Sequence, residues 1–558
     1  MVTSAASISS RARGIDTNHR RVIFASSLGT VFEWYDFYLY GSLSTIITKQ
    51  FFSGVNETTG FIFALLAFAA GFFVRPFGAL LFGRFGDLIG RKHTFLITII
   101  IMGSSTALVG MLPSYASIGV AAPLMLITLR LLQGLALGGE YGGAATYVAE
   151  HAPPHRRGFY TSWIQTTATL GLFLSLLIIL ACRLWLGDAF DTWGWRIPFL
   201  ISLLLLAVSV YIRLQLHESP AFLEIKNEGK LSKAPLSEAF GRWDNLKIVI
   251  LALLGATAGQ AVVWYGGQFY ALFFLEKILQ VDGKSANLII AAGLAIGTPF
   301  FVLFGALSDK IGRKTVIMAG CILAAITYFP VFKGLTHYAN PALEQAVATA
   351  PVTVVADPKD CSLQFDPIGK KAFTNSCDVA KSALAKAGVP YVNESAPAGS
   401  IARVRIGSGA SAAVVDSFAG SAMAKADFKP ATETFSKTLK DSLTAAGYPA
   451  KADMAQVNFP MLIVLCAYLV VLVTMVYGPI AAWLVELFPT RIRYSSMSLP
   501  YHIGNGWFGG FLPVTSFAIV AATGNIYNGL WYPVAVAIMT AIIGTLFLRE
   551  TKDQPLPN

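Results

Sequence analysis

The chain alternates between long runs of apolar residues and short polar connections. A bilayer-spanning helix needs about 20 mainly apolar residues. Twelve runs meet this requirement, and several exceed it, so we expect some helices to tilt or extend into the interface. The predicted spans are residues 22–48, 59–82, 93–112, 121–148, 158–184, 196–217, 246–277, 285–308, 314–333, 457–487, 493–523 and 527–548. The pattern predicts an all-α membrane protein with twelve transmembrane helices.

One long polar segment interrupts this pattern. Residues 334–456 are rich in Ala, Lys, Ser, Asp and Gly and contain no span. Within them, residues 352–355 and 402–406 have the composition of short strands, and 378–387 and 433–446 that of helices. We therefore expect a small α/β domain inserted between helices nine and ten. A lid, a partner-docking surface and a neutral insertion all remain open as its role.

Two sequence blocks occur twice. GRFGDLIGRKHT at 83–94 and GALSDKIGRKTV at 305–316 share Gly-x-x-x-Asp-x-Ile-Gly-Arg-Lys at an offset of 305 − 83 = 222. The pattern Glu-x-x-Pro-x-x-x-Arg at 150–157 and 486–493 has an offset of 486 − 150 = 336. The difference, 336 − 222 = 114, is close to the length of the polar segment. Duplication of a six-helix unit, with the polar segment as an extra domain in the second half, explains both offsets.

The repeats and the polar segment together define the expected domains. Residues 1–217 form an N-terminal six-helix half, and residues 218–245 form a linker. Residues 246–333 supply helices seven to nine of the second half, which residues 457–558 complete after the inserted domain at 334–456.

Composition narrows the classes of protein that fit. The chain is 55% hydrophobic and only 13% charged, whereas soluble domains carry about 25% charged residues. A large soluble enzyme is therefore excluded, and we expect no catalytic residues, cofactor or metal. A phosphate-binding Gly-x-x-x-x-Gly-Lys-Ser/Thr motif is absent from the sequence, which argues against coupling to ATP.

Charge gives the expected orientation. Most basic residues of the short connections fall on one side, which the positive-inside rule makes cytoplasmic. Both termini then lie inside and residues 334–456 outside, and we expect no cleaved signal peptide. The net charge of +11 needs no nucleic-acid partner, because this bias and an anionic membrane surface account for it.

The five cysteines divide between two environments. Cys182, Cys321 and Cys466 lie in or beside spans, where cysteine usually acts as a small apolar side chain. Cys361 and Cys377 lie in the external segment, where oxidising conditions favour a disulfide. The alternative of a metal site is weak, because further Cys or His ligands are lacking nearby in the sequence.

The first repeated block resembles the signature of the major facilitator superfamily. Three further stretches resemble its metabolite:proton symporter family: FEWYDFYLYG at 32–41, RLLQGLALGGEYGG at 130–143 and YHIGNG at 501–506. The resemblance covers the chain except for 334–456. It implies two pseudo-symmetric six-helix halves and a carrier of small metabolites such as 2-oxoglutarate, citrate, shikimate, proline or betaine.

Charged residues inside the predicted spans are the candidates for proton coupling. Burying a charge at the centre of a bilayer costs at least about 2.5–3.5 kcal/mol, so such residues usually face a cavity or a partner. Glu33 and Asp36 share one face of the first span, and the fourth span carries Arg130 and Glu140. An internal ion-pair network is the structural alternative. The resemblance points to Asp36 and Arg130 as the coupling pair.

Cations, amides and aromatic rings in mid-span are the candidates for substrate binding. Packing or anchoring at the membrane interface is the alternative for each aromatic residue. The clustering of Trp264 and Tyr265 with two glycines favours a substrate-facing role, and His502 is a further titratable neighbour. The predicted substrate ligands are Arg75, Arg130, Gln260, Trp264, Tyr265, Gln268, Tyr501 and Asn505.

The repeated blocks supply the predicted gate. In the superfamily that the chain resembles, these loops hold the cytoplasmic side closed in the outward-facing state. Their aspartates suit a neighbouring helix N-terminus, and their arginines suit carboxylates. The predicted gating residues are Gly83, Asp87, Gly90, Arg91, Glu150, Arg157, Asp309, Gly312, Arg313, Glu486 and Arg493.

These observations predict a proton-coupled symporter that imports a small organic acid across a bacterial inner membrane by alternating access. The expected partners are the substrate, for which the charges favour a carboxylate, together with protons and lipid, and no oligomer is required. Two alternatives remain: a transporter-like sensor that uses the external domain, and a carrier of zwitterionic osmolytes.

Overall fold

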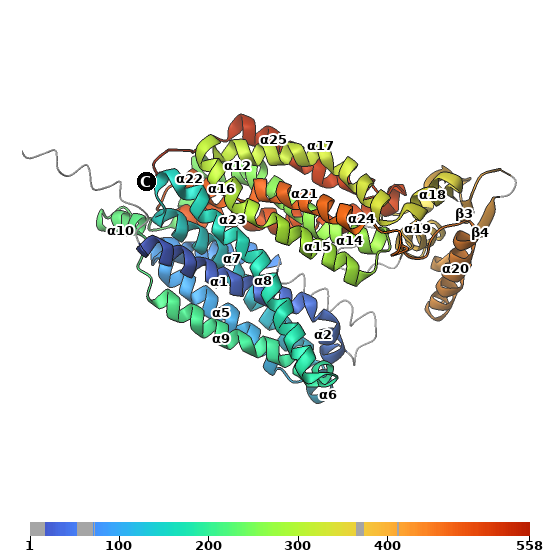
Figure 1. The fold of residues 1–558 in the computed structure, drawn as a ribbon, viewed down its shortest axis with the longest axis horizontal. Helices are drawn as coiled ribbons and strands as arrows, with labels where there is room; N and C mark the ends of the chain where they lie inside the picture. The colour runs from blue at the N-terminus through green and yellow to red at the C-terminus, as the bar shows by residue number, and fades with distance from the viewer. Residues whose placement is uncertain (1–16, 53–70, 72, 364–372, 410–411, 558) are drawn as a thin grey trace, which may run out of the picture.

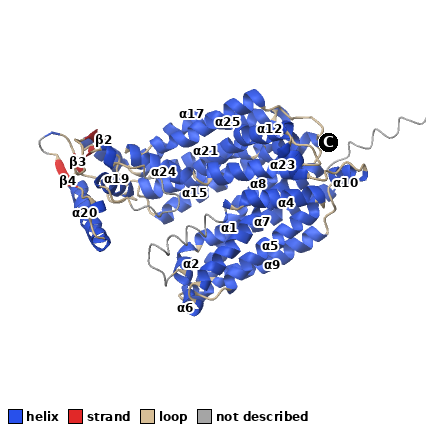
Figure 2. Cartoon of the chain, turned by 180° about the vertical axis from the view of Figure 1, so that it is seen from behind, coloured by secondary structure: helices blue, strands red, loops and turns tan. Residues whose placement is uncertain are grey.

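The computed structural model describes residues 17–52, 71, 73–363, 373–409 and 412–557. Its helices form two groups that lie side by side (Figure 1). The groups are closest at the end that carries α10 and the C-terminus, and they separate toward the end that carries α2, α6 and a small β-containing domain. The view from behind shows the same arrangement (Figure 2). We call the first end the latch end.

The first group is formed by the N-terminal part of the chain. Its elements are α1 (Thr17–Ser42), α2 (Ser44–Phe51), α4 (Arg75–Leu88), α5 (Arg91–Met111), α6 (Tyr115–Ile118), α7 (Ala121–His151), η1 (Pro154–Arg156), α8 (Arg157–Leu186), η2 (Phe190–Gly194) and α9 (Arg196–Leu214). The first predicted span contains α1 and α2, and most of the second lies outside the described residues.

Two short helices, α10 (Pro220–Asn227) and α11 (Pro235–Gly241), lead to the second group. That group comprises α12 (Trp243–Ala252), η3 (Leu253–Thr257), α13 (Ala258–Tyr265), η4 (Gly266–Tyr270), α14 (Ala271–Phe273), η5 (Phe274–Ile278), α15 (Gly283–Gly297), α16 (Pro299–Ile311), α17 (Arg313–Ala339), α21 (Phe459–Tyr477), α22 (Ile480–Leu487), α23 (Arg493–Ile503), η9 (Gly504–Gly509), α24 (Leu512–Thr523), η10 (Asn528–Leu530) and α25 (Trp531–Phe547).

Ten stretches of the described chain are helical, long and apolar enough to cross a membrane. They run from Arg91–Met111 to Asn528–Phe547 and match the third to twelfth predicted spans. The two halves meet through α8 with α16 and through α4 with α23. Apolar side chains on the outer surfaces of both groups, such as Leu184, Leu204 and Leu546, are exposed, as expected for surfaces that face lipid.

The repeated blocks are helix ends rather than long loops. Asp87 lies in the last turn of α4 and Asp309 in that of α16. Each helix is followed by a glycine at positive φ, Gly90 at 117° and Gly312 at 108°, which caps the next helix. Other residues rarely adopt this conformation. Gly90 and Gly312, the second of the two glycine positions that the blocks share, therefore make the sharp turn between two spans.

The small domain between α17 and α21 has a four-stranded sheet. Its strands are β1 (Val352–Ala356), β2 (Val392–Ser395), β3 (Arg403–Ile406) and β4 (Ala413–Asp416), in the order β2-β1-β3-β4. β1 is parallel to β2 and antiparallel to β3, with Val354 opposite Val404. The two predicted strands correspond to β1 and β3. The short, largely exposed β2 and β4 lack the alternating pattern that would reveal them.

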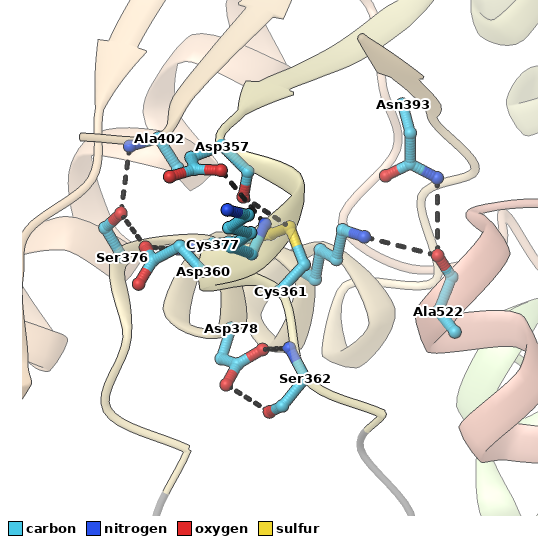
Figure 3. The surroundings of a disulfide bond; sticks show 12 residues. Asp357, Asp360, Cys361, Ser362, Ser376, Cys377, Asp378, Asn393, Ala402 and Ala522 are labelled. Atoms are coloured by element: carbon cyan, nitrogen blue, oxygen red, sulfur yellow. Dashed lines mark hydrogen bonds between the residues drawn. A yellow bond between two sulfur atoms is a disulfide. The ribbon is translucent and has the colours of Figure 1, made fainter. Parts of the chain in front are cut away.

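Helices complete the domain: α18 (Pro341–Thr349), η6 (Pro358–Asp360), α19 (Ser376–Lys386), η8 (Gly420–Ala422) and α20 (Lys425–Ala445). Because α17 continues to Ala339, the domain begins about six residues later than the predicted 334. Cys361 and Cys377 are joined by a disulfide. Figure 3 shows the carboxylates beside it, where Asp360 accepts a hydrogen bond from Ser376 and Asp378 accepts one from the Ser362 amide.

The domain is bonded to the end of α24. The Tyr391 amide donates to Gly524 O at 2.9 Å, and the Tyr391 hydroxyl donates to Ala521 O. Lys381 Nζ and Asn393 Nδ2 both donate to Ala522 O at 3.3 Å (Figure 3). The last carbonyls of a helix lack partners within it. Side chains and backbone of the inserted domain therefore cap α24.

Candidate functional site

A small cavity of about 30 Å³ lies between the two helix groups. Residues of both groups line it, and six of the twelve described lining residues are Trp or Tyr. They are Thr30, Trp34, Arg75, Tyr141, Ile164, Gln165, Trp264, Tyr265, Tyr477, Tyr501, His502 and Asn505. A solute bound in this central cavity could contact both halves at once.

Aromatic contacts join the halves around the cavity. Tyr141 of α7 stacks on Tyr501 of α23 with ring centroids 3.6 Å apart and planes 3° from parallel. The Tyr501 hydroxyl lies 2.5 Å from the hydroxyl of Tyr477. Trp34 of α1 lies 5.8 Å from Trp264 of α13, measured between ring centroids. Movement of one half against the other would separate these pairs.

Five of the predicted substrate ligands line the cavity: Arg75, Trp264, Tyr265, Tyr501 and Asn505. Gln260 lies behind Asn505, and the two amides exchange hydrogen bonds of 3.2 Å. This pair fixes the orientation of Asn505, so Gln260 positions a lining residue.

Two predicted ligands lie elsewhere. Gln268 is buried but does not line the cavity, although it follows Trp264 by four residues. Gln268 lies within Gly266–Tyr270, which is a π-helix, and its wider turn displaces residues from the face expected for an α-helix. Arg130 also lies outside the lining, with its guanidinium 3.9 Å from the centroid of the Tyr40 ring.

Several lining residues were absent from the prediction. Trp34 and Tyr141 lie within the stretches at 32–41 and 130–143, so their motifs could have indicated them. Gln165 donates to the Tyr141 hydroxyl at 2.9 Å. Thr30, Ile164 and Tyr477 carry no signal in a single sequence, because helices distant in the chain bring them to the cavity.

Asp36 is buried in the first half and accepts two side-chain hydrogen bonds. Ser202 Oγ donates to Oδ1 at 2.8 Å, and Thr106 Oγ1 donates to Oδ2 at 2.9 Å. Gln133 Nε2 donates to Thr106 Oγ1, and Arg130 Nη1 donates to Gln133 Oε1 at 2.8 Å. Thr106 and Gln133 therefore connect the predicted coupling pair by three consecutive hydrogen bonds. Neither residue was predicted, since both are uncharged.

The other predicted coupling residues differ from Asp36. Glu140 forms an ion pair with Arg213, 2.5 Å apart, and accepts a hydrogen bond of 2.7 Å from Thr98. These three residues belong to α7, α9 and α5 of the same half. The geometry supports the alternative of a structural ion pair for Glu140, whose partner the prediction had missed. The Glu33 side chain lies outside what the structure describes.

The first repeated block joins the halves at the latch end. Asp87 of α4 accepts hydrogen bonds from the amides of Tyr494 and Ser495 in the first turn of α23, at 3.2 and 2.9 Å. A carboxylate at a helix N-terminus satisfies free amides and favours the helix dipole. Gly83 allows this approach, because a Cβ there would lie 2.8 Å from Ser495 Cα.

Fully buried ions surround Asp87. Arg91 pairs with Asp87 at 2.9 Å and lies 3.6 Å from Glu150. Glu150 in turn pairs across the halves with Arg493 at 2.7 Å. Buried charges are tolerated only when they are paired and hydrogen-bonded. We call Asp87, Arg91, Glu150 and Arg493 the first latch.

The second repeated block forms an equivalent set with the halves exchanged. Asp309 of α16 accepts hydrogen bonds from the amides of Gly158 and Phe159 in α8, at 2.9 and 2.8 Å. Arg313 pairs with Asp309 at 2.7 Å and with Glu486 at 3.1 Å. The pair between halves, Arg157 with Glu486, is 3.6 Å long. This second latch (Asp309, Arg313, Glu486 and Arg157) is looser between the halves than the first.

A third repeated feature was missed from the sequence. Glu218 accepts hydrogen bonds from the amides of Arg91 and Lys92, and Glu550 accepts them from those of Arg313 and Lys314. A Cβ on Gly90 would lie 2.2 Å from Glu218 Oε2, and one on Gly312 would lie 2.4 Å from Glu550 Oε2. The signal is the shared Leu-x-Leu-x-Glu-Ser/Thr at 214–219 and 546–551.

Comparison with known proteins agrees with this architecture. The sequence model of the family described as sugar (and other) transporter matches residues 22–355 and 442–558. A putative metabolite transport protein of Haemophilus influenzae is 31% identical over 544 residues, covering 96% of this chain and 95% of that protein. The shikimate transporter of Escherichia coli is 36% identical over 325 residues, covering 57% of this chain and 72% of that protein.

A further relative is the alpha-ketoglutarate permease of Escherichia coli, which is 36% identical over 345 residues and covers 61% of this chain and 78% of that protein. Among solved structures, the proton:xylose symporter XylE bound to 6-bromo-6-deoxy-D-glucose superposes with a TM-score of 0.58. At 16% identity it covers 97% of this chain and 98% of that one, which establishes a shared fold.

The family match leaves residues 356–441 unmatched. These residues fall within the inserted domain, whereas both helix groups are matched almost completely. The resemblance to the major facilitator superfamily, drawn from the repeated blocks, is confirmed. The chain belongs to the sugar (and other) transporter family of this superfamily and is a multi-pass membrane transporter.

Proposed function

We propose that this transporter is a proton-coupled symporter that imports a small organic acid across a bacterial inner membrane by alternating access. The observation that carries the proposal is the hydrogen-bonded connection from Asp36 to Arg130 beside the cavity. Charged side chains inside a membrane protein are costly and are usually retained for coupling or binding. Asp36 would take up the proton, and Arg75 with Arg130 would attract the anion.

Electrostatic linkage explains how the two events would be coupled. An anion near Arg75 and Arg130 adds negative charge near Asp36, and a nearby negative charge favours the protonated form of a carboxyl group. The effect is reciprocal, because a proton on Asp36 removes a competitor for the arginines and strengthens anion binding. Proton and anion would therefore bind together, which is the requirement for symport.

The hydrogen bonds around Asp36 can accommodate both protonation states. When Asp36 is ionised, Thr106 donates to it. When Asp36 is protonated, the Thr106 hydroxyl can turn to Met102 O, which lies 3.0 Å from Thr106 Oγ1. Thr106 Oγ1 would then accept from both Asp36 and Gln133, so its hydrogen-bonding capacity would remain satisfied.

The proposed topology has twelve spans with both termini and the latch end in the cytoplasm. The inserted domain, residues 334–456, would then be periplasmic. Both latches are formed and the helix groups separate toward the opposite end (Figure 1). These features favour a state closed toward the cytoplasm. Opening would require Asp87 and Asp309 to leave the helices of the opposite half.

Proteoliposomes with an internal pH indicator test this function. A symporter moves protons inward when its substrate is added outside, and an imposed proton gradient drives accumulation of that substrate. A sensor on a transporter scaffold would bind the solute without either flux. A carrier of zwitterionic osmolytes would give proton-coupled flux with betaine or proline rather than with organic acids.

A further inference from the structure

An apolar groove of about 490 Å³ lies between α17 and α25. The two helices are neighbours at the outer edge of the second group, away from the first group (Figure 1). Isoleucines with large exposed surfaces line the groove, among them Ile326 at 66% and Ile542 at 52%. Ala325 and Ala541 also line it, and their small side chains leave the space between the helices open. Both helices belong to stretches long and apolar enough to span a membrane, so the groove opens to lipid.

The corresponding helices of the first half are packed closely at the same place. Gly103 of α5 precedes Ala325 by 325 − 103 = 222 positions, the offset of the repeated blocks. Leu206 of α9 precedes Ile538 by 538 − 206 = 332 positions, which equals the offset 546 − 214 = 332 of the Leu-x-Leu-x-Glu pattern. A Cβ on Gly103 would lie 3.0 Å from Leu206 Cδ1, so the Leu206 side chain fills this place in the first half. The groove is therefore not a general consequence of the fold.

The length of the groove matches one leaflet of a bilayer. Ile538 and Leu546 of α25 both line it and are 546 − 538 = 8 residues apart. At 1.5 Å per residue this separation is about 12 Å along the helix, close to half of the roughly 30 Å hydrocarbon core. Leu546 lies in the last turn of α25, at the latch end. An acyl chain of the leaflet at that end would therefore lie along the groove, with its headgroup beyond Leu546.

Basic side chains lie where this headgroup would be. Lys314 Nζ donates to Thr545 O at 3.2 Å and to Leu548 O at 3.0 Å, and Thr545 itself lines the groove. An ammonium group has three donors, so a third remains for a phosphate oxygen. The exposed Arg549 follows the end of α25. The carboxylate of the adjacent Glu550 accepts hydrogen bonds from two backbone amides. Basic pockets between transmembrane helices are complementary to anionic headgroups.

We propose that the groove between α17 and α25 binds an anionic glycerophospholipid of the leaflet at the latch end. One acyl chain would lie between the two helices, and the phosphate would accept hydrogen bonds from Lys314 and Arg549. The lipid would then connect the start of α17 to the end of α25 beside the second latch. This site is separate from the central cavity, and the inference depends neither on proton coupling nor on the substrate.

Native mass spectrometry of the purified full-length protein tests the site with two lipids. Dioleoylphosphatidylglycerol and dioleoylphosphatidylcholine carry the same acyl chains and differ in net charge, and each is added at the same concentration. Attraction between an anionic lipid and one basic residue is worth about fivefold in affinity. We therefore expect the protein to retain at least fivefold more of the phosphatidylglycerol. Equal retention of the two lipids would overturn the proposal of an anionic headgroup.

A matched pair of lysine variants tests the position of the headgroup. Lys314→Gln should reduce binding of dioleoylphosphatidylglycerol about fivefold and change binding of dioleoylphosphatidylcholine less than twofold. Lys92→Gln is the control, because Lys92 precedes Lys314 by 314 − 92 = 222 positions and donates to Leu214 O at 3.0 Å in the half where Leu206 fills the groove. Lys92→Gln should bind both lipids as the native protein does. Equal losses in the two variants would refute a headgroup site at Lys314.

Variants of the lining test the position of the acyl chain. Ala325→Leu places a larger side chain in the groove and should reduce binding of both lipids at least fivefold. Ile326→Ala removes exposed apolar surface without disturbing the core and should weaken both by a smaller factor. Ala295→Leu adds the same volume to an exposed position of α15 and should leave binding unchanged. Native binding in both Ala325→Leu and Ile326→Ala would refute the proposal. A protein dimer that Ala325→Leu abolishes would also refute it, because a second copy would then occupy the groove.

Discussion

Asp87 and Asp309 bind the same part of two different helices, each in the half to which it does not belong. Asp87 accepts from the amides of residues 494 and 495 in α23, and Asp309 from those of 158 and 159 in α8. In both helices these are the second and third residues. The duplication therefore produced two reciprocal contacts, and opening at this end must break both.

The first latch should contribute more to closure than the second. We expect Asp87→Asn to favour opening at the latch end by about 2 kcal/mol, or roughly 30-fold, because a neutral amide replaces charge-assisted hydrogen bonds. Asp309→Asn should have a smaller effect. The second latch is less buried than the first, and its ion pair between the halves is longer. Labelling of single cysteines placed on the latch-end surface measures opening. Equal labelling in native and Asp87→Asn proteins would contradict a gating role.

Glu218 and Glu550 should stabilise the first turns of α5 and α17 in the same way. Each accepts hydrogen bonds from the first two amides of the helix that follows the repeated glycine. Replacing a charged acceptor at such a site typically costs about 1–2 kcal/mol. We expect Glu218→Gln and Glu550→Gln each to lower thermal stability and to raise latch-end labelling. Glu228→Gln is the control, because Glu228 forms an exposed pair with Lys230. If Glu218→Gln had no larger effect than Glu228→Gln, Glu218 would not stabilise the latch end.

Asp36 should be required for accumulation but not for exchange. Asn keeps the shape of the side chain but cannot take up a proton, so we expect Asp36→Asn to reduce gradient-driven accumulation at least tenfold. Exchange of labelled for unlabelled substrate needs no net proton movement and should persist. Uphill uptake at the native level in this variant would exclude Asp36 as the coupling group.

The connection from Asp36 to Arg130 makes a separate prediction. Thr106→Val removes the hydroxyl that joins Asp36 to Gln133, whereas Ser202→Ala removes the other hydrogen bond of Asp36 and leaves the connection intact. Each variant loses a buried hydrogen bond of about 1 kcal/mol. We expect Thr106→Val to reduce accumulation about fivefold relative to exchange and Ser202→Ala to reduce it less. Equal accumulation-to-exchange ratios would show that the connection is only structural.

The sequence predicted the architecture better than the contacts. Spans, halves and the positions of Asp87 and Asp309 follow from apolar runs and repeats, which are local. The pairing of Asp87 with α23 joins residues more than 400 positions apart, so a single sequence cannot reveal it. The roles of Thr106 and Gln133 were not predicted, because both side chains are neutral and only charged residues stand out inside apolar spans. Gln268 was misplaced because helical periodicity assumes 3.6 residues per turn, whereas Gln268 lies within a π-helix.

The inserted domain should be sensitive to acid at Asp357. Its carboxylate accepts hydrogen bonds from the Gly399 and Lys359 amides, at 2.9 and 3.0 Å, and these lower the pKa of Asp357 below its ordinary value. A lowered pKa in the folded state adds stability above the unfolded pKa of about 3.9, and this is lost as pH falls further. Asp357→Asn should therefore speed exchange of the Gly399 amide hydrogen at pH 7. The difference should narrow as pH falls below the ordinary pKa of an aspartate, about 3.9, and the carboxylate takes up its proton.

The control for Asp357 is Asp416→Asn, which removes only a highly exposed pair with Arg403. Exposed pairs contribute about 0–1 kcal/mol. Exchange of the Gly399 amide should therefore be the same in Asp416→Asn and the native protein throughout this pH range. A difference between Asp357→Asn and native protein that did not narrow as the pH was lowered would assign the effect to shape rather than charge.

The last prediction concerns how the inserted domain is attached to the helices. Tyr391, Lys381 and Asn393 donate to the final carbonyls of α24, and each such hydrogen bond is worth about 1 kcal/mol. The double variant Lys381→Met, Tyr391→Phe removes two side-chain donors, so docking should weaken by about 2 kcal/mol, or roughly 30-fold. Spin labels at Lys284→Cys and Lys437→Cys would report the separation of α15 and α20. Their distance distribution should be narrow in the native background and broad in the double variant.

Lys451→Met, on an exposed residue of the same domain, should leave it narrow. A narrow distribution in the double variant would instead mean that the apolar core, continuous from Val404 to Leu462, holds the domain without these hydrogen bonds.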